Sequence, residues 1–323
     1  MKRVPFIITI DTEGDDLWSK PKDIKTDNAK GLYRFQDLCN KHGLKPVYLT
    51  NYEMAMSEVF VEFGRHYAEK GECEIGMHLH AWNSPPEFDL TGDDYAQQPF
   101  LFEYPKEVID SKVLFMTDLL NKKFARSIVS HRAGRWGMSK DYFSILGKYG
   151  YLVDCSVTPG VDWSRVKGRA DGNGGTDYYH SMHAPYIISN ESNNSILEVP
   201  MTIRGKSRLP MLSFFNPFQY KLPKIAHKVF YKNNWLRPSR GNLEQMKALI
   251  TDEVKSGCVH LEFMIHSSEL SAGLNPNFST EVEIEKLYED LEELFSFISG
   301  YTIGMTLADF QHSFMGRNEN NGH

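Results

Sequence analysis

Residues 4–14 read VPFIITIDTEG, a short β-rich run that ends directly in two carboxylates, Asp11 and Glu13. The same arrangement recurs at residues 73–80, CEIGMHLH, where a second predicted strand ends in His78 and His80. Side chains two positions apart on a strand point to the same face, so each pair presents both of its side chains together. The two stretches therefore predict strands whose carboxyl ends share one polar site.

Strands and helices alternate along the rest of the sequence. Apolar residues at helical spacing predict helices at residues 31–42, 58–70, 106–124, 140–148, 243–255 and 282–299. Further β-rich runs predict strands at residues 45–50, 127–130, 151–156, 196–203, 259–266 and 301–305. This alternation indicates an α/β protein with a parallel sheet and crossover helices. So many repeats favour a (β/α) barrel of seven or eight strands with inserted loops.

The composition is that of an ordinary globular protein. The chain has 323 residues, of which 41% are hydrophobic and 24% charged, and its net charge is -6. These values exclude collagen, coiled-coil rods and disordered chains. The apolar run at residues 4–10 is too short for a signal peptide, which predicts a cytoplasmic location. The four cysteines are far apart and form no CxxC pair, so we expect structural thiols.

Polar residues collect at the ends of the predicted strands. Six of them are Asp11, Thr50, His80, His131, Asp154 and His266. The strand ends of a parallel barrel surround its active site, so we predict a site at this mouth. A carboxylate with two imidazoles is a ligand set for Zn²⁺ or another first-row divalent ion. A hydrogen-bonded core pair would also explain His78 and His80 alone, but the nearby acidic pair favours a metal.

Five segments resemble the motifs of the polysaccharide deacetylase (NodB-homology, carbohydrate esterase 4-like) superfamily. In chain order they are residues 9–13, 74–80, 132–137, 154–156 and 263–266. The resemblance covers nearly the whole chain, from about residue 4 to residue 310. The HxHxW and RxGRWG elements look most like the branch found with lipopolysaccharide biosynthesis, the WalW-like proteins.

The resemblance implies a role for each matching residue. Asp11 would be the general base, kept ionised by Arg132. His266 would be the general acid, oriented by the carboxylate of Asp154. The implied ligands of a divalent metal, expected to be Zn²⁺, are Glu13, His78 and His80.

Aromatic and basic residues follow the motifs on predicted loops. Trp82, Arg135 and Trp136 are candidate substrate-binding residues, and Trp163 lies on a further loop. Tryptophan faces can stack on sugar rings, but loop tryptophans also cap barrels. Both interpretations stay open.

Residues 204–241 form a basic, aromatic segment with nine Lys or Arg and no Asp or Glu. One interpretation is a solvated face of an inserted helical hairpin. The other is a lid that binds anions, either a membrane surface or the pyrophosphate of a nucleotide- or lipid-linked sugar. Nucleic acid is not expected, because the rest of the chain is acidic and carries no motif for it. We predict a single barrel domain over residues 1–312 and a disordered polar tail over 313–323.

Together these features predict a metal-dependent amide hydrolase. It would remove an N-acyl group, expected to be acetyl, from an amino sugar in lipopolysaccharide or other surface-polysaccharide synthesis. The metal would polarise the acyl carbonyl, a base would deprotonate water and an acid would protonate the leaving amine. One alternative is a deformylase of a lipid-linked amino sugar. Another is a barrel without metal that binds a glycan or scaffolds other proteins.

Overall fold

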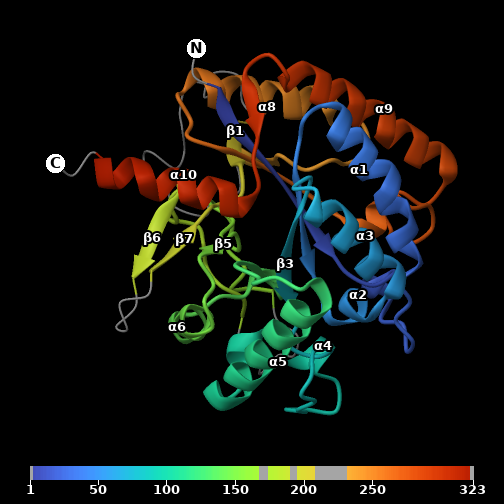
Figure 1. Ribbon diagram of the computed structural model, residues 1–323, viewed down its shortest axis with the longest axis vertical. Helices are drawn as coiled ribbons and strands as arrows, with labels where there is room; N and C mark the ends of the chain where they lie inside the picture. The colour runs from blue at the N-terminus through green and yellow to red at the C-terminus, as the bar shows by residue number, and fades with distance from the viewer. Residues whose placement is uncertain (1–2, 167–173, 190–194, 208–230, 321–323) are drawn as a thin grey trace.

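The computed structural model describes residues 3–166, 174–189, 195–207 and 231–320. The strands of its main sheet are β1 (Val4–Thr12), β2 (Pro46–Thr50), β3 (Glu74–Leu79), β4 (Ser130–Ala133), β5 (Val153–Asp154), β6 (Tyr186–Ser189), β7 (Ser195–Glu198), β10 (Leu261–His266) and β11 (Thr302–Gly304). Their order is β10-β1-β2-β3-β4-β5-β7-β6, with β11 beside the start of β1. Only β6 runs antiparallel to its neighbour. The sheet curls into a half-barrel (Figure 1), which confirms the predicted α/β barrel class.

Irregular backbone joins the segment that follows β7 to β10. Leu236 N donates to the carbonyl of Thr202 at 3.0 Å, and Met264 N donates to the carbonyl of Leu236 at 3.1 Å. The hairpin of β8 (Ile203–Ser207) and β9 (Tyr231–Trp235) starts and ends at this point. The barrel is therefore completed by loop segments and not by strand pairing among the described residues.

Helices surround the sheet, and only the last of those described packs against its inner face. They are α1 (Leu32–Lys41), α2 (Tyr52–Met56), α3 (Glu58–Glu69), α4 (Asp94–Gln97), α5 (Lys106–Phe124), α6 (Lys140–Lys148), α8 (Leu243–Lys255), α9 (Glu281–Ile298) and α10 (Leu307–Asn320). The six helices predicted from apolar spacing agree with α1, α3, α5, α6, α8 and α9 to within one residue at each end. Their apolar sides, with Phe35, Phe63 and Leu291 among them, pack in one buried core against the sheet.

Helix α10 seals the inner face of the sheet at the end opposite the polar residues. Its Phe310 and Phe314 pack in an apolar cluster with Ile7, which shares a face of β1 with Asp11. The predicted disordered tail over residues 313–323 is therefore wrong up to residue 320, because these phenylalanines give a helix an apolar side to bury. The last three residues lie outside the described part.

The basic segment predicted over residues 204–241 is described only at its two ends. Residues 208–230 lie outside the described part, so the anion-binding lid and the membrane contact stay predictions. None of the described helices is long and apolar enough to cross a bilayer.

Candidate active site

Strand register brings the polar residues of the inner face together. Asp11 on β1 lies beside His266 on β10, and His78 on β3 lies beside Arg132 on β4. Glu13 and His80 follow their strands two residues beyond Asp11 and His78, on the same sides. The predicted acidic pair and His pair therefore meet at one end of the barrel.

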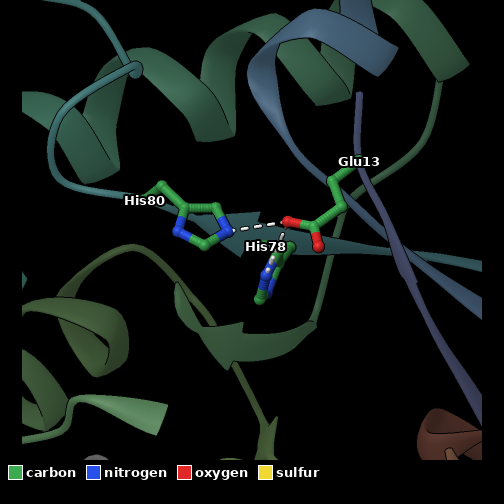
Figure 2. Close-up of side chains that lie close together, drawn as sticks. All are labelled: Glu13, His78 and His80. Atoms are coloured by element: carbon green, nitrogen blue, oxygen red, sulfur yellow. Dashed lines mark hydrogen bonds and ion pairs between the residues drawn. The ribbon is translucent and has the colours of Figure 1, made fainter. Parts of the chain in front are cut away.

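Glu13, His78 and His80 form a buried cluster of metal-ligand type (Figure 2). Glu13 Oε2 lies 2.8 Å from His80 Nε2 and 3.7 Å from His78 Nε2. One ligand atom from each residue lies within 4.8 Å of the other two. The three residues implied as metal ligands by the sequence motifs thus lie together.

The chemistry of this cluster fits a first-row divalent ion. His78 Nδ1 donates to the backbone carbonyl of Arg132 at 3.0 Å, which leaves Nε2 as a lone pair facing Glu13. Burial lowers the pKa of His78 to about 4, so the ring is neutral, as metal binding requires. His80 Nδ1 is buried without a hydrogen-bond partner among the described residues, against Gly134. A Cβ at Gly134 would lie 2.5 Å from this nitrogen, so only glycine lets the ring sit here.

Arg132 anchors Asp11 from below the cluster. Its Nη1 donates to Asp11 Oδ1 at 2.6 Å, and its Nη2 donates to Thr9 Oγ1 at 2.8 Å and to Glu262. Burial alone would raise the pKa of Asp11, but Arg132 and the neighbouring imidazoles hold it well below its usual range. Asp11 is therefore ionised, and its second oxygen, Oδ2, lies 3.8 Å from His266 Nε2.

His266 is held by an ion pair that the sequence analysis missed. Its Nδ1 lies 2.9 Å from Arg237 Nη2 and 3.3 Å from Glu269 Oε2, and Arg237 donates to Glu269 at 3.0 Å. Burial alone would raise the pKa of Glu269, but Arg237 and His266 hold it well below its usual range. The ring's other nitrogen, Nε2, faces the cluster at 3.5 Å from Glu13 Oε1. A carboxylate three residues after a strand-end histidine is the signal that could have revealed Glu269.

The predicted pairing of Asp154 with His266 is not formed. Asp154 Oδ2 instead accepts from His131 Nδ1 at 2.6 Å, and His131 Nε2 lies 2.7 Å from the hydroxyl of Tyr142 on α6. The reason is that Asp154 is the register partner of His131 and points with it to the outer face, whereas His266 lines the cavity on the inner face. Glu269 takes the position beside His266.

The cluster forms the floor of a cavity of about 370 Å³. The three substrate-binding candidates, Trp82, Arg135 and Trp136, all line it, and so does Trp163. The lining also includes Trp18 and Tyr95, which the sequence analysis did not single out. A second cavity of about 310 Å³ adjoins the first and shares Trp136, Trp163 and Arg237 with it.

Comparisons with known proteins identify the fold. No family model and no curated protein sequence matches the chain. Solved structures do match. A Mycobacterium smegmatis protein assigned as a polysaccharide deacetylase has a TM-score of 0.58 at 12% identity, over 98% of this chain and 92% of that one. A Pseudomonas aeruginosa PAO1 protein with the same assignment has a TM-score of 0.54 at 12% identity, over 96% and 90% of the two chains.

A third structure, Puue allantoinase, has a TM-score of 0.52 at 11% identity, over 96% of this chain and 90% of that one. Identities this low establish the fold alone. The chain has the NodB-like barrel fold of the polysaccharide deacetylases, as its motifs predicted.

Proposed function

We propose that the protein is a metal-dependent hydrolase that removes an N-acyl group, expected to be acetyl, from an amino sugar of surface-polysaccharide synthesis, such as that of lipopolysaccharide. One arrangement carries this proposal: the ligand-type cluster of Glu13, His78 and His80 lies beside Asp11 and His266 on the floor of an aromatic cavity. The fold shared with proteins assigned as polysaccharide deacetylases supports it.

The cluster would hold the metal through one carboxylate and two neutral imidazoles. When bound, a divalent ion supplies Lewis-acid chemistry, which polarises the acyl carbonyl and makes water more acidic. An amide carbon is a poor electrophile, so this chemistry and a positioned acid and base are all needed.

Asp11 would act as the general base. Arg132 occupies its Oδ1 and fixes the carboxylate plane, while Oδ2 points toward the neighbouring imidazoles of the site. The low pKa of Asp11 keeps this oxygen ionised and able to accept the proton of the attacking water.

His266 would act as the general acid. Because the Arg237 guanidinium can only donate, its 2.9 Å contact makes Nδ1 an acceptor and leaves the proton on Nε2. Nε2 faces the cluster, and the ring would act as an acid once it carries a second proton, on Nδ1 toward Glu269, so that it gives the Nε2 proton to the leaving amine and returns to the neutral form. Glu269, 3.3 Å from Nδ1, stabilises the ring when both nitrogens carry protons.

Metal content and acyl release together test the proposal. We expect the purified protein to bind about one divalent ion and to release acetate from an N-acetylated amino-sugar oligomer. His78→Ala should lose the ion and reduce activity by about 10³-fold or more, since Lewis-acid stabilisation contributes several kcal/mol. Elemental analysis and an assay for the free amine measure the two effects. His66→Ala, on exposed α3 surface, is the matched control that should change neither.

A parent protein without bound divalent ion, together with a His78→Ala variant of unchanged stability and activity, would disprove the proposal. Parallel assays with N-formyl and N-acetyl substrates separate deformylation from deacetylation. Glycan binding without acyl release from either substrate would favour the non-catalytic alternative.

A further inference from the structure

Arg135 differs from the other arginines around the site in having no ionic partner among the described residues. Arg132 is paired with Asp11 and Glu262, and Arg237 is paired with Glu269. Arg135 lines the cavity, and within the described part of the chain no carboxylate lies at ion-pair distance from its guanidinium. Its positive charge is therefore not neutralised by those residues.

Aromatic side chains hold Arg135 in place. Its guanidinium carbon lies 4.6 Å from the ring centre of Tyr95 and 5.2 Å from that of Trp82. Such contacts orient a guanidinium through its flat faces and leave its charge and the donors on its edge available. Lys20, which also lies over Tyr95, is by contrast paired with Asp93.

The backbone turn that carries Arg135 is also held in one conformation. Arg135 and Trp136 have φ values of 52° and 60°, in the left-handed region that residues with a Cβ rarely occupy. The turn is closed by Gly137 N, which donates to the carbonyl of Gly134 at 3.2 Å, and by Tyr178, whose hydroxyl donates to the carbonyl of Trp136 at 2.6 Å. Strained backbone that is held this way is typical of functional positions.

We propose that Arg135 binds an anionic oxygen group of the substrate, a phosphate or a carboxylate, close to the sugar whose acyl group is removed. This inference rests on the proposed function, because it places the substrate in the same cavity. A guanidinium presents paired donors that match both of these groups. A neutral sugar would leave the charge of Arg135 without a counterpart, so the site should prefer an acidic or phosphorylated amino sugar to a neutral one.

Binding of sugars that carry no acyl group tests this without any turnover. The probes are glucose 1-phosphate, glucuronic acid and neutral glucose, and quenching of tryptophan fluorescence or calorimetry reports their binding to the metal-loaded full-length protein. We expect at least one anionic probe to bind about tenfold or more tightly than glucose, because a charge-assisted hydrogen bond typically contributes that much. Comparing the two anions distinguishes phosphate from carboxylate as the group recognised.

Arg135→Gln should remove this preference and leave the binding of glucose unchanged, while Arg135→Lys should retain part of it. The matched control is Arg34→Gln, since Arg34 also stacks on a tyrosine, at 3.8 Å from the ring centre of Tyr288, but is paired with Glu285 on the surface. Equal binding of all three sugars, an anion preference that survives in Arg135→Gln, or no binding of either anion at millimolar concentration would overturn the inference. Acyl release from a neutral substrate with no anion preference would overturn this inference alone and leave the hydrolase proposal standing.

Discussion

Two clusters of histidine and carboxylate lie near the ends of the sheet strands. They differ in the face of the sheet that they occupy and in how many of their polar atoms have hydrogen-bond partners. The open cluster, Glu13, His78 and His80, faces a cavity. The closed cluster, His131 and Asp154, lies beneath Tyr142 of α6. Both are buried, so burial does not distinguish them. The two clusters differ instead in the face of the sheet on which they lie.

Strand parity decides which side each histidine takes. His78 has Arg132 as its register partner, and both point to the inner face. Met77 and His131 are the next pair along, and they point to the outer face, where His131 meets Asp154. A shift of one position along the strand therefore separates a cavity-lining imidazole from a core imidazole.

Saturation of hydrogen bonds is the second difference. Both ring nitrogens of His131 have close partners, and Asp154 also accepts from the backbone and hydroxyl of Ser156, at 3.0 and 2.9 Å. In the open cluster, His80 Nδ1 has no partner among the described residues and His78 Nε2 is 3.7 Å from the nearest oxygen of Glu13. The unpaired Nε2 of His78 is available to a ligand, whereas the fully paired ring of His131 contributes to stability.

The largest expected effect is the difference in kcat between an aspartate variant on the inner face and one on the outer face. Asp11→Asn should lower kcat by about 10²–10⁴-fold, because the base is lost while its volume is kept, and metal content should not change. Asp154→Asn, the matched substitution on the outer face, should leave kcat within about tenfold of the parent and reduce thermal stability instead. Steady-state kinetics and elemental analysis on both variants check this. If Asp154→Asn lost as much activity as Asp11→Asn, the division into open and closed clusters would be wrong.

A smaller effect, on stability, is expected when the closed cluster loses its histidine. His131→Leu leaves Asp154 as a buried carboxylate without its imidazole, which should lower the free energy of unfolding by about 3–5 kcal/mol. Bound metal per folded chain should stay the same. Urea denaturation gives the first quantity and elemental analysis of the folded fraction gives the second. Loss of metal from a folded His131→Leu variant would contradict the structural role assigned here.

Much of the fold and part of the site could be predicted from local patterns. Helical spacing located six helices to within a residue, because their apolar sides are continuous, but it missed α10. The pairs at Asp11 and His78 were recognisable because each follows an apolar run and has a period of two. The resemblance to the deacetylase motifs then supplied Arg132 as a candidate and a role for His266, which its place at a strand end had already marked.

The features that could not be predicted depend on how strands pair and on contacts between residues far apart in the sequence. The sequence does not show which residues of neighbouring strands pair, so the outward direction of His131 and Asp154 was missed. Arg237 follows β9 in the sequence and contacts His266, and no local sequence pattern indicates this contact. Glu262 is a carboxylate inside the otherwise apolar strand β10, and that contrast could have marked it as a partner for a buried arginine.

On each face of the sheet, a carboxylate whose pKa is lowered lies close to a carboxylate whose pKa is raised. On the outer face, burial and the charge of Asp154 raise the pKa of Glu198 well above its usual range. On the inner face, burial raises the pKa of Glu262 to about 7, while Asp11, on the same arginine, stays ionised. Glu262 Oε1 accepts from Arg132 and from Thr9, and Oε2 has no partner among the described residues, so a proton taken up by Glu262 would lie on Oε2.

The smallest expected effect follows from this difference and is a change in the pH dependence of stability. Between about pH 4.5 and pH 7 the folded protein keeps the proton of Glu262 and the unfolded chain releases it, so stability should fall as the pH rises. This group should contribute a loss of up to about 1.4 kcal/mol per pH unit in metal-free protein. Glu262→Gln mimics the protonated form and should remove that part of the slope. Urea denaturation of metal-free parent and variant at pH 5 and at pH 7 measures the difference, and two parallel stability profiles would show that Glu262 is ionised beside Arg132.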